Sequence, residues 1–235
     1  MISFIVPAYN EERLLGRTLS AIHQAARELA LPYELLVADD GSTDQTGKVA
    51  RAHGAVVVRV QYRQISRTRN AGARASRGDY LIFIDADTVL TPAVLRATID
   101  ALRQGAAGGG AGFRFDGRLP LYARLLSPLV NAVMRAGGMA AGCYVFCSRE
   151  AFEAVGGFDD RLYGAEELVF SRALRRRGPM VILEDAVTTS GRKMRAYSGW
   201  ELLRLFAGLL PRGLAGVWTP DRLAFWYSDR REDPG

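Results

Sequence analysis

The chain has 235 residues, 49% of them hydrophobic and 24% charged, with 31 Lys plus Arg against 25 Asp plus Glu and a net charge of +6. This composition is typical of one globular domain with a sizeable core, which excludes wholesale disorder, a collagen-like repeat and a small disulfide scaffold. The two cysteines, Cys143 and Cys147, stand four residues apart in a stretch expected to be extended, so we expect no bridge and a reducing compartment.

Short apolar runs rich in β-branched residues recur along the first 104 residues. They predict strands at residues 2–6, 34–38, 55–60 and 80–84. Between them lie helical patterns, which we expect at residues 10–29 with Asn10 as the N-cap, at 42–52 with Ser42 and Gln45 as a capping box, at 67–77, and after Thr91 and Pro92. Strands that alternate with helices indicate a parallel sheet covered on both faces.

The alternation is less regular after residue 105. We expect a further strand after the glycine-rich stretch, an apolar helical segment at 119–138 interrupted by Pro128, a strand at 140–147, and helices at 149–155 and 164–177. The predicted fold is α/β, with a Rossmann-like, mainly parallel central sheet flanked by helices and a smaller mixed C-terminal part.

The positive charge is unevenly distributed. Only Lys48 and Lys193 are lysines, so arginine supplies the other 29 basic residues. Residues 45–78 contain no acidic residue but eight basic ones: Lys48, Arg51, Arg59, Arg63, Arg67, Arg69, Arg74 and Arg77. A GC-rich genome explains a high arginine total but not this clustering. Motifs for nucleic-acid binding are missing, so we expect no nucleic-acid partner; a phosphorylated substrate or an anionic membrane surface fits better.

Carboxylates follow two of the predicted strands. Asp39 and Asp40 come directly after the second strand, and Asp85 and Asp87 leave the fourth as Asp-Ala-Asp. Ligands of open parallel sheets bind at the carboxyl ends of the strands, where neighbouring carboxylates raise one another's pKa unless a cation compensates. Turns after strands also favour Asp for backbone reasons. Together with the arginine-rich stretch, the pattern favours a diphosphate site with bound Mg²⁺ or Mn²⁺.

Five segments carry a family resemblance. In chain order they are VPAYNEE, VADDGSTDQT, RTRNAGARASRGDYLIFIDADT, FEAVGGFDDRLYGAEELVFSRALRRRG and TTSGRK. Over about residues 2–195 the chain resembles the family 2 glycosyltransferases of the GT-A fold. The resemblance implies transfer of a sugar, with inversion, from a nucleotide-diphosphate sugar, most often a UDP-sugar, with Mg²⁺ or Mn²⁺ as the cofactor.

The resemblance also implies roles for residues of the nucleotide half. Those expected to line the base and ribose pocket are Pro7, Ala8, Tyr9, Glu11 and Asp40, with Asp40 against the base. Arg69 and Asn70 would lie near the nucleotide, Asp85 would hold the ribose or the donor sugar, and Asp87, with Asp85, would bind the metal. Turn and helix-cap duty explains Tyr9 and Asn10 equally well.

Two adjacent glutamates match the family's third motif. The family usually has Glu-Asp there, with the second carboxylate as the general base; this chain has Glu166 and Glu167. The resemblance therefore implies Glu167 as the base, with Glu166 as the alternative because the extra methylene changes the reach. Acidic residues in a first helical turn are also common partners of the helix dipole.

Basic and amphipathic residues follow the third motif. Arg192 and Lys193 match a loop that would close over the diphosphate or bind an acceptor phosphate. We expect a catalytic domain at 1–195, with a nucleotide-binding half at 1–104 and an acceptor half at 105–195, and an amphipathic extension at 196–235. That extension would lie on an anionic membrane or pack on the domain or on a second copy in a homo-oligomer.

Location and acceptor stay open at this stage. The N-terminus lacks a basic leader and a cleavage site, so we expect a cytoplasmic protein, peripheral on the inner face of the membrane. The acceptor would be a hydroxyl or, alternatively, a polyprenyl phosphate, for which a general base is less needed because the acceptor is already an anion. A non-catalytic module that binds sugar nucleotides is the third reading.

Overall fold

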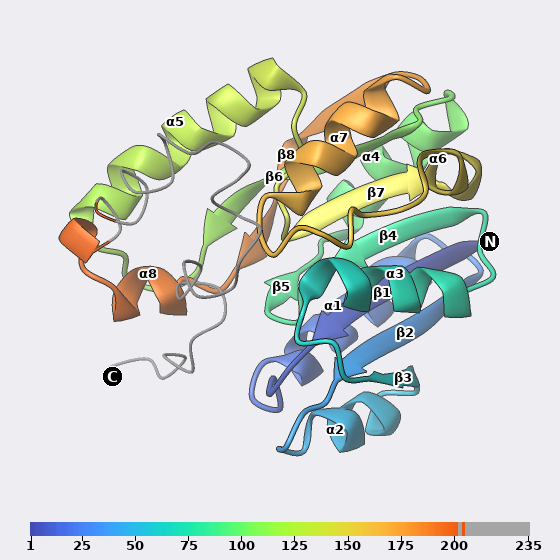
Figure 1. Ribbon diagram of the computed structural model, residues 1–235, viewed down its shortest axis with the longest axis horizontal. Helices are drawn as coiled ribbons and strands as arrows, with labels where there is room; N and C mark the ends of the chain where they lie inside the picture. Colours follow the sequence, from blue (N-terminus) through green and yellow to red (C-terminus); the bar gives the residue numbers. More distant parts are fainter. Residues whose placement is uncertain (202–203, 205–235) are drawn as a thin grey trace.

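A computed structural model describes residues 1–201 and 204 (Figure 1). The strands are β1 (Ile2–Ala8), β2 (Tyr33–Asp40), β3 (Val56–Val60), β4 (Tyr80–Ile84), β5 (Thr88–Val89), β6 (Gly108–Phe115), β7 (Tyr144–Ser148) and β8 (Met180–Thr189). The helices are α1 (Leu15–Glu28), α2 (Thr46–Ala52), α3 (Ile65–Ala75), α4 (Pro92–Arg103), α5 (Leu121–Gly137), α6 (Arg149–Val155), α7 (Glu166–Arg175) and α8 (Arg192–Ala196). Most of the predicted amphipathic extension lies outside the described residues.

The strands form one mixed sheet in the order β3-β2-β1-β4-β7-β6-β8-β5. Strands β3, β2, β1 and β4 are parallel, β7 is antiparallel to both β4 and β6, and β8 is parallel to β6. Because β7 is antiparallel to both of its neighbours, β6 and β8 point the same way as β4. The C-terminal ends of β1, β2, β3, β4, β6 and β8 therefore share one edge, called the carboxyl edge below. The predicted α/β class with a mixed C-terminal part is confirmed.

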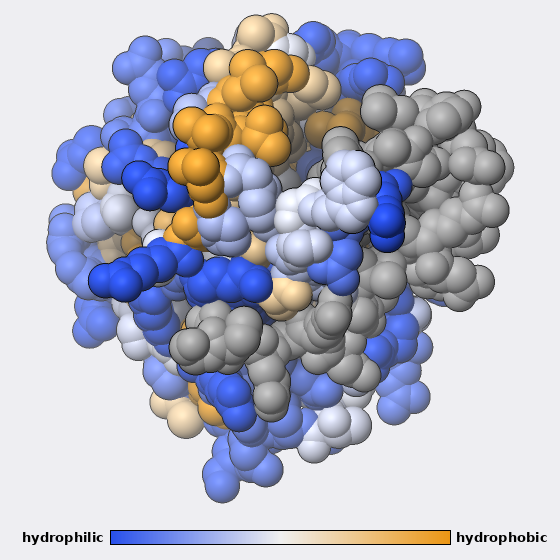
Figure 2. Space-filling view, turned by 90° about the vertical axis from the view of Figure 1, so that its left-hand side faces the viewer, coloured by the Kyte–Doolittle hydropathy of each residue, from blue (hydrophilic) through white to orange (hydrophobic). Residues whose placement is uncertain are grey.

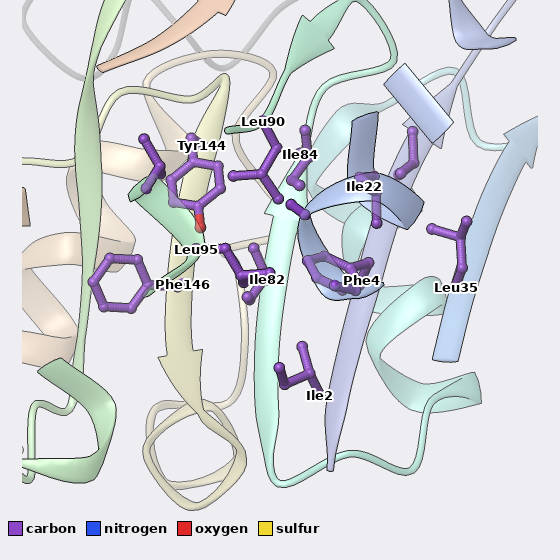
Figure 3. Packing of buried hydrophobic residues seen from close by; sticks show 14 of the residues in the cluster. Ile2, Phe4, Ile22, Leu35, Ile82, Ile84, Leu90, Leu95, Tyr144 and Phe146 are labelled. Carbon is purple, nitrogen blue, oxygen red and sulfur yellow. The ribbon is translucent and has the colours of Figure 1, made fainter. Parts of the chain in front are cut away.

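Helices cover both faces of the sheet (Figure 1). On one face α1 and α4 enclose a core in which side chains of β1 and β4 meet those of the helices, among them Phe4, Ile22, Ile82 and Leu95 (Figure 3). On the other face α3, α6 and α7 pack over a second core rich in phenylalanine, where the rings of Phe158 and Phe170 stack with centroids 4.1 Å apart. Burial on both faces explains why β1 and β4 read as continuous apolar runs rather than alternating ones.

The glycine run in β6 has a steric cause. A Cβ on Gly109 would stand 2.0 Å from the carbonyl oxygen of Val181 in β8 and 2.4 Å from the Phe146 ring. Only glycine permits this approach, so the run that weakens a strand by propensity is required by its neighbours. Within the described residues, none of the helices combines the length and the apolar character needed to cross a bilayer.

Two predicted helix starts were wrong. Helix α1 begins at Leu15 rather than at Asn10, which has a φ of 52° and lies in the preceding loop. Helix α2 begins at Thr46, so Ser42 does not cap it. The reason is that the two loops bind each other: the Asn10 N–H donates to Ser42 Oγ (3.0 Å), and the Thr43 N–H donates to Asn10 Oδ1 (2.9 Å).

The second half also departs from two expectations. Helix α5 runs unbroken through Pro128 instead of being interrupted there. Strand β8, which no pattern singled out, occupies residues 180–189 and pairs with β6 on either side of Glu184 and Asp185. Its buried positions are spaced irregularly because the register shifts between Ala111 and Gly112 of β6. The irregular spacing removes the alternation by which strands are recognised in a sequence.

Candidate active site

A buried arginine joins three segments at the carboxyl edge. Arg69 extends from α3, and its side chain is only 1% exposed. Its Nη1 lies 2.6 Å from Glu166 Oε1, and its Nη2 donates to Asp85 Oδ1 (3.0 Å) and to the Gly142 carbonyl (2.8 Å). We call these four residues the Arg69 cluster. The two carboxylates raise the pKa of the guanidinium against the opposing effect of burial, so it is a permanent cation that fixes both acids in place.

The two adjacent glutamates have different environments. Glu166 is buried and paired with Arg69, whereas Glu167 is half-buried and forms no ion pair within residues 1–201 and 204. Burial raises the pKa of Glu167 to about 8, the charge of Glu166 adds to the rise, and Arg69 opposes it. The raised pKa makes Glu167 a candidate general base.

A second arginine holds the other aspartate of Asp-Ala-Asp. Arg192 Nη2 lies 2.5 Å from Glu11 Oε1 and 3.3 Å from Asp87 Oδ2. Thr189, at the end of β8, donates its hydroxyl to Asp87 Oδ1 at 3.3 Å. We call Arg192, Glu11, Asp87 and Thr189 the Arg192 cluster. Its members come from the ends of β1, β4 and β8, so the shared edge brings residues from opposite ends of the sequence together.

Both aspartates carry an unfavourable charge in this environment. Burial raises the pKa of Asp85 despite Arg69, and burial raises that of Asp87 despite Arg192. Lys193, half-buried, lies near enough for its charge to lower both pKa values. A dication would relieve the same cost more fully.

The donor set fits a metal that shares its ligands with a substrate. Within the described ranges, no group of three or more His, Cys, Asp or Glu is arranged to hold a metal ion. Asp85 and Asp87 nevertheless offer hard carboxylate oxygens, with side chains 31% and 18% exposed. Mg²⁺ is usually held by one or two carboxylates plus substrate phosphates, so this pair suits Mg²⁺ or Mn²⁺ completed by a diphosphate.

The residues predicted for the base pocket lie at the ends of β1 and β2. Pro7 and Ala8 are buried within β1. The ring of Tyr9 lies under the guanidinium of Arg63, 3.4 Å from its centroid. Arg63, named above only among the eight basic residues of 45–78, lies in the loop before α3 with a φ of 51°. The position of Arg63 after the third strand was the sequence feature that could have placed it in this loop.

Asp40 is engaged by the same loop. It is 5% exposed, and its oxygens accept hydrogen bonds from the backbone N–H groups of Tyr62, Arg63 and Gln64 and from the Thr68 hydroxyl. The N–H contacts of Arg63 and Gln64 measure 2.9 and 3.1 Å. In this structure Asp40 therefore fixes the loop that carries Arg63 over Tyr9.

Asn70 and its neighbours tie α3 to the loop before α7. Asn70 Nδ2 donates to the carbonyl of Phe158 (2.8 Å) and to Asp160 Oδ1 (2.7 Å), and its Oδ1 accepts from the Phe158 N–H (2.9 Å). Gln64, which the sequence did not single out, donates to the carbonyls of Asp160 (2.6 Å) and Leu162 (2.9 Å). These bonds set the position from which Glu166 and Glu167 enter α7.

The arginine-rich stretch does not converge on the aspartates. Of its eight basic residues only Arg69 is buried, and the other seven are exposed. Lys48, Arg51 and Arg59 line a separate hollow of about 700 Å³ beside Asp39, and its lining includes no member of the Arg69 or Arg192 clusters. The eight basic residues therefore do not form one block that faces a phosphate, and of these eight, all within the described part of the chain, only Arg69 contacts the aspartates of Asp-Ala-Asp.

The fold is shared with solved glycosyltransferases of the GT-A class. A mannosyltransferase from Pyrobaculum calidifontis, in complex with GDP-Man and Mn²⁺, has a TM-score of 0.69 at 20% identity and covers 97% of this chain and 70% of its own. Glucosyl-3-phosphoglycerate synthase from Mycobacterium tuberculosis, in complex with Mn²⁺ and UDP-glucose, has a TM-score of 0.61 at 21% identity, covering 94% of this chain and 78% of its own.

Sequence comparison identifies the family. The model of glycosyl transferase family 2 matches residues 3–156, more than half of the chain, so the chain belongs to this family. An undecaprenyl-phosphate 4-deoxy-4-formamido-L-arabinose transferase of Pseudomonas paraeruginosa is 32% identical over 153 residues, 61% of this chain and 44% of that protein. A validoxylamine A glucosyltransferase of Streptomyces hygroscopicus subsp. limoneus is 32% identical over 110 residues, 43% of this chain and 23% of its own length. The chain spans less than half the length of these curated relatives.

Proposed function

We propose that the chain transfers a sugar, with inversion, from a nucleotide-diphosphate sugar, by preference a UDP-sugar, to an acceptor hydroxyl, with Mg²⁺ or Mn²⁺ as the cofactor. One observation carries the proposal. Arg69 binds Asp85 and Glu166 in a single buried set and leaves the adjacent Glu167 with a pKa raised to about 8. A carboxyl with such a pKa is suited to general-base catalysis near neutral pH.

The proposed reaction is a single displacement. Glu167 accepts the proton of the acceptor hydroxyl while the oxygen of that hydroxyl forms a bond to the anomeric carbon. The bond from the anomeric carbon to the diphosphate oxygen breaks at the same time. Asp87 and Asp85 would hold the metal, whose positive charge would stabilise the departing diphosphate. Arg192 and Lys193 would add positive charge on the same side, with Arg192 turning from Asp87 to the phosphate.

The donor assignment draws on the neighbouring structures. One was solved with GDP-Man and Mn²⁺ and another with UDP-glucose and Mn²⁺, which supports a nucleotide-diphosphate sugar and a divalent metal for this chain. The contact of Tyr9 with Arg63 and the loop fixed by Asp40 supply an aromatic face and a closed turn where a base would lie. In this proposal residues 1–104 bind the nucleotide and 105–195 the acceptor.

A polyprenyl-phosphate acceptor is the second candidate. The Pseudomonas relatives carry names of undecaprenyl-phosphate transferases, which favours it. Such an acceptor is already ionised, so Glu167 would matter less, and the chain would act in peripheral contact with an anionic membrane from the cytoplasmic side.

A matched set of variants tests the proposal. Asp87→Asn is expected to abolish both sugar transfer and the Mn²⁺-dependent thermal stabilisation by nucleoside diphosphates. Glu167→Gln is expected to keep that stabilisation but to lower transfer to a hydroxyl acceptor by about 100-fold or more. Glu184→Gln, at an exposed position of β8, is the control and should behave like the wild type.

Each other outcome has a defined meaning. Full transfer by Glu167→Gln to a polyprenyl phosphate but not to a hydroxyl would establish the second candidate. Full transfer to both would remove Glu167 as the base. Nucleotide binding without transfer or donor hydrolysis in the wild type would leave a non-catalytic binding module.

A further inference from the structure

Helix α5 has two unlike halves. One half is fixed to the sheet: Ala123 is buried, Asn131 exchanges hydrogen bonds with the N–H and C=O of Phe113 (both 2.9 Å), and Arg135 Nη2 donates to the Leu183 carbonyl (3.2 Å). The other half carries six large apolar side chains that are 43–68% exposed: Leu121, Leu125, Leu126, Leu129, Val130 and Val133. At about 100° per residue these six fall within one half of the helix circumference.

The six residues form a patch rather than scattered exposure. They account for six of the ten exposed large hydrophobic residues in the described part of the chain. The side of the molecule on which α5 lies shows apolar side chains gathered in one orange band beside strongly hydrophilic ones (Figure 2). Contiguous exposed apolar surface of this kind marks an interaction site in a water-soluble domain.

The segment of the chain that carries the patch has charges of one sign only. No acidic residue occurs between Asp116 and Glu150. Arg114, Arg118 and Arg124 are exposed, and none of them forms an ion pair within the part of the chain that the structure describes. A second copy of the chain, related by two-fold symmetry, would place these arginines against one another. Anionic lipid headgroups would instead neutralise them.

We propose that α5 is a membrane-docking helix whose apolar half enters the headgroup and acyl boundary of an anionic leaflet, with the flanking arginines at the lipid phosphates. An apolar face bordered by arginine is the pattern of helices that lie in the plane of the interface. Asn131 and Arg135 hold the opposite half against β6 and β8, so the helix lies along the membrane surface.

The docking helix is connected to the candidate active site. The Tyr122 hydroxyl of α5 lies 2.8 Å from the Met194 carbonyl and 2.9 Å from that of Tyr197, which joins α5 to α8 and its flank. Helix α8 carries Arg192, which contacts Asp87. Docking would therefore bring α8, and with it Arg192, close to the leaflet. The docking itself is independent of the proposed function. The consequence that a lipid-linked acceptor reaches the site from the bilayer rests on the proposed function.

Vesicle flotation with the full chain tests the proposal. The wild type is expected to float with vesicles of equal parts phosphatidylglycerol and phosphatidylcholine at low salt, and far less with phosphatidylcholine alone. Leu129→Glu, at a position 60% exposed, should lower the bound-to-free ratio by at least about tenfold, because a carboxylate is costly at the acyl boundary. Val56→Glu, at an edge-strand position 59% exposed, is the matched control and should bind as the wild type does.

Three results would overturn the proposal. Failure of the wild type to float with anionic vesicles would leave the face to another occupant, such as the chain's own C-terminal residues. Equal flotation of the wild type and Leu129→Glu would exclude this face. A concentration-dependent dimer that Leu129→Glu abolishes would make the face an interface between copies. Stabilisation by nucleoside diphosphates with Mn²⁺, measured on the same variants without vesicles, reports on the proposed function separately.

Discussion

The two aspartates of Asp-Ala-Asp are held by two arginines of very different kinds. Arg69 extends from α3 inside the packed molecule, is 1% exposed and has partners on three segments. Arg192 extends from α8, a five-residue helix with no buried residue, and is 11% exposed. The difference indicates that Arg69 is the more deeply packed of the two arginines and that Arg192 lies on the less buried segment.

Removing Arg69 should have the largest effect on stability. Arg69→Met leaves Glu166 buried without its counter-ion and is expected to lower the free energy of unfolding by about 3–5 kcal/mol, measured by urea denaturation. Arg67→Met, on the same helix at an exposed position, should change it by less than about 0.5 kcal/mol. Addition of Glu166→Gln to Arg69→Met should recover part of the loss. An unchanged stability in Arg69→Met would show that the cluster is not a rigid element.

The pH dependence of stability should reveal Glu167. Its folded-state pKa, raised to about 8, lies above that of an unfolded glutamate, so the folded state binds the extra proton between about pH 4.5 and 8. Stability should therefore fall as the pH rises through this range, by at most about 1.4 kcal/mol per pH unit. Glu167→Gln should flatten the slope in urea midpoints recorded from pH 5 to 8. The same slope in both proteins would contradict the assignment.

Removing Arg192 should have the smallest effect on stability. Arg192→Ala is expected to cost about 1–2 kcal/mol, because Glu11 and Asp87 lie nearer to solvent than Glu166 does. If Arg192 moves from Asp87 to the diphosphate, the variant should also bind nucleoside diphosphates about tenfold more weakly in calorimetric titrations. Arg195→Ala serves as the control, because Arg195 lies on the same helix as Arg192 but its side chain contacts Asp116. A stability loss equal to that of Arg69→Met would erase the distinction between the two clusters.

The sequence revealed those features that depend on neighbouring residues. Apolar runs located β1, β2 and β4, and the aspartates after β2 and β4 indicated the edge of the sheet that carries the site. Motif resemblance supplied the family, which the match over residues 3–156 confirmed. The assigned roles of individual site residues stay predictions.

Features that depend on distant residues could not be predicted. Arg69 and Glu166 are 97 positions apart, and their pairing follows from the placement of α3 and α7 over the same core. The caps expected at Asn10 and Ser42 failed for the same reason, because each side chain found a partner in the opposite loop. The contact of Thr189 with Asp87 depends on β8, whose irregular register hid the strand itself.

The reversal of β7 between β4 and β6 has a consequence for how the molecule can vary. Residues 116–143 leave the sheet at the end of β6, form α5, and return to β7 beside it. The register of β4 and β7 is fixed by their own pairing and does not pass through this excursion. The exposed face of α5 can therefore change while Asp85, Arg69 and Glu166 keep their places, whereas Gly142, whose carbonyl accepts from Arg69, has to stay. The exposed apolar face of α5 and the buried contacts of Arg69 can therefore vary separately within one chain.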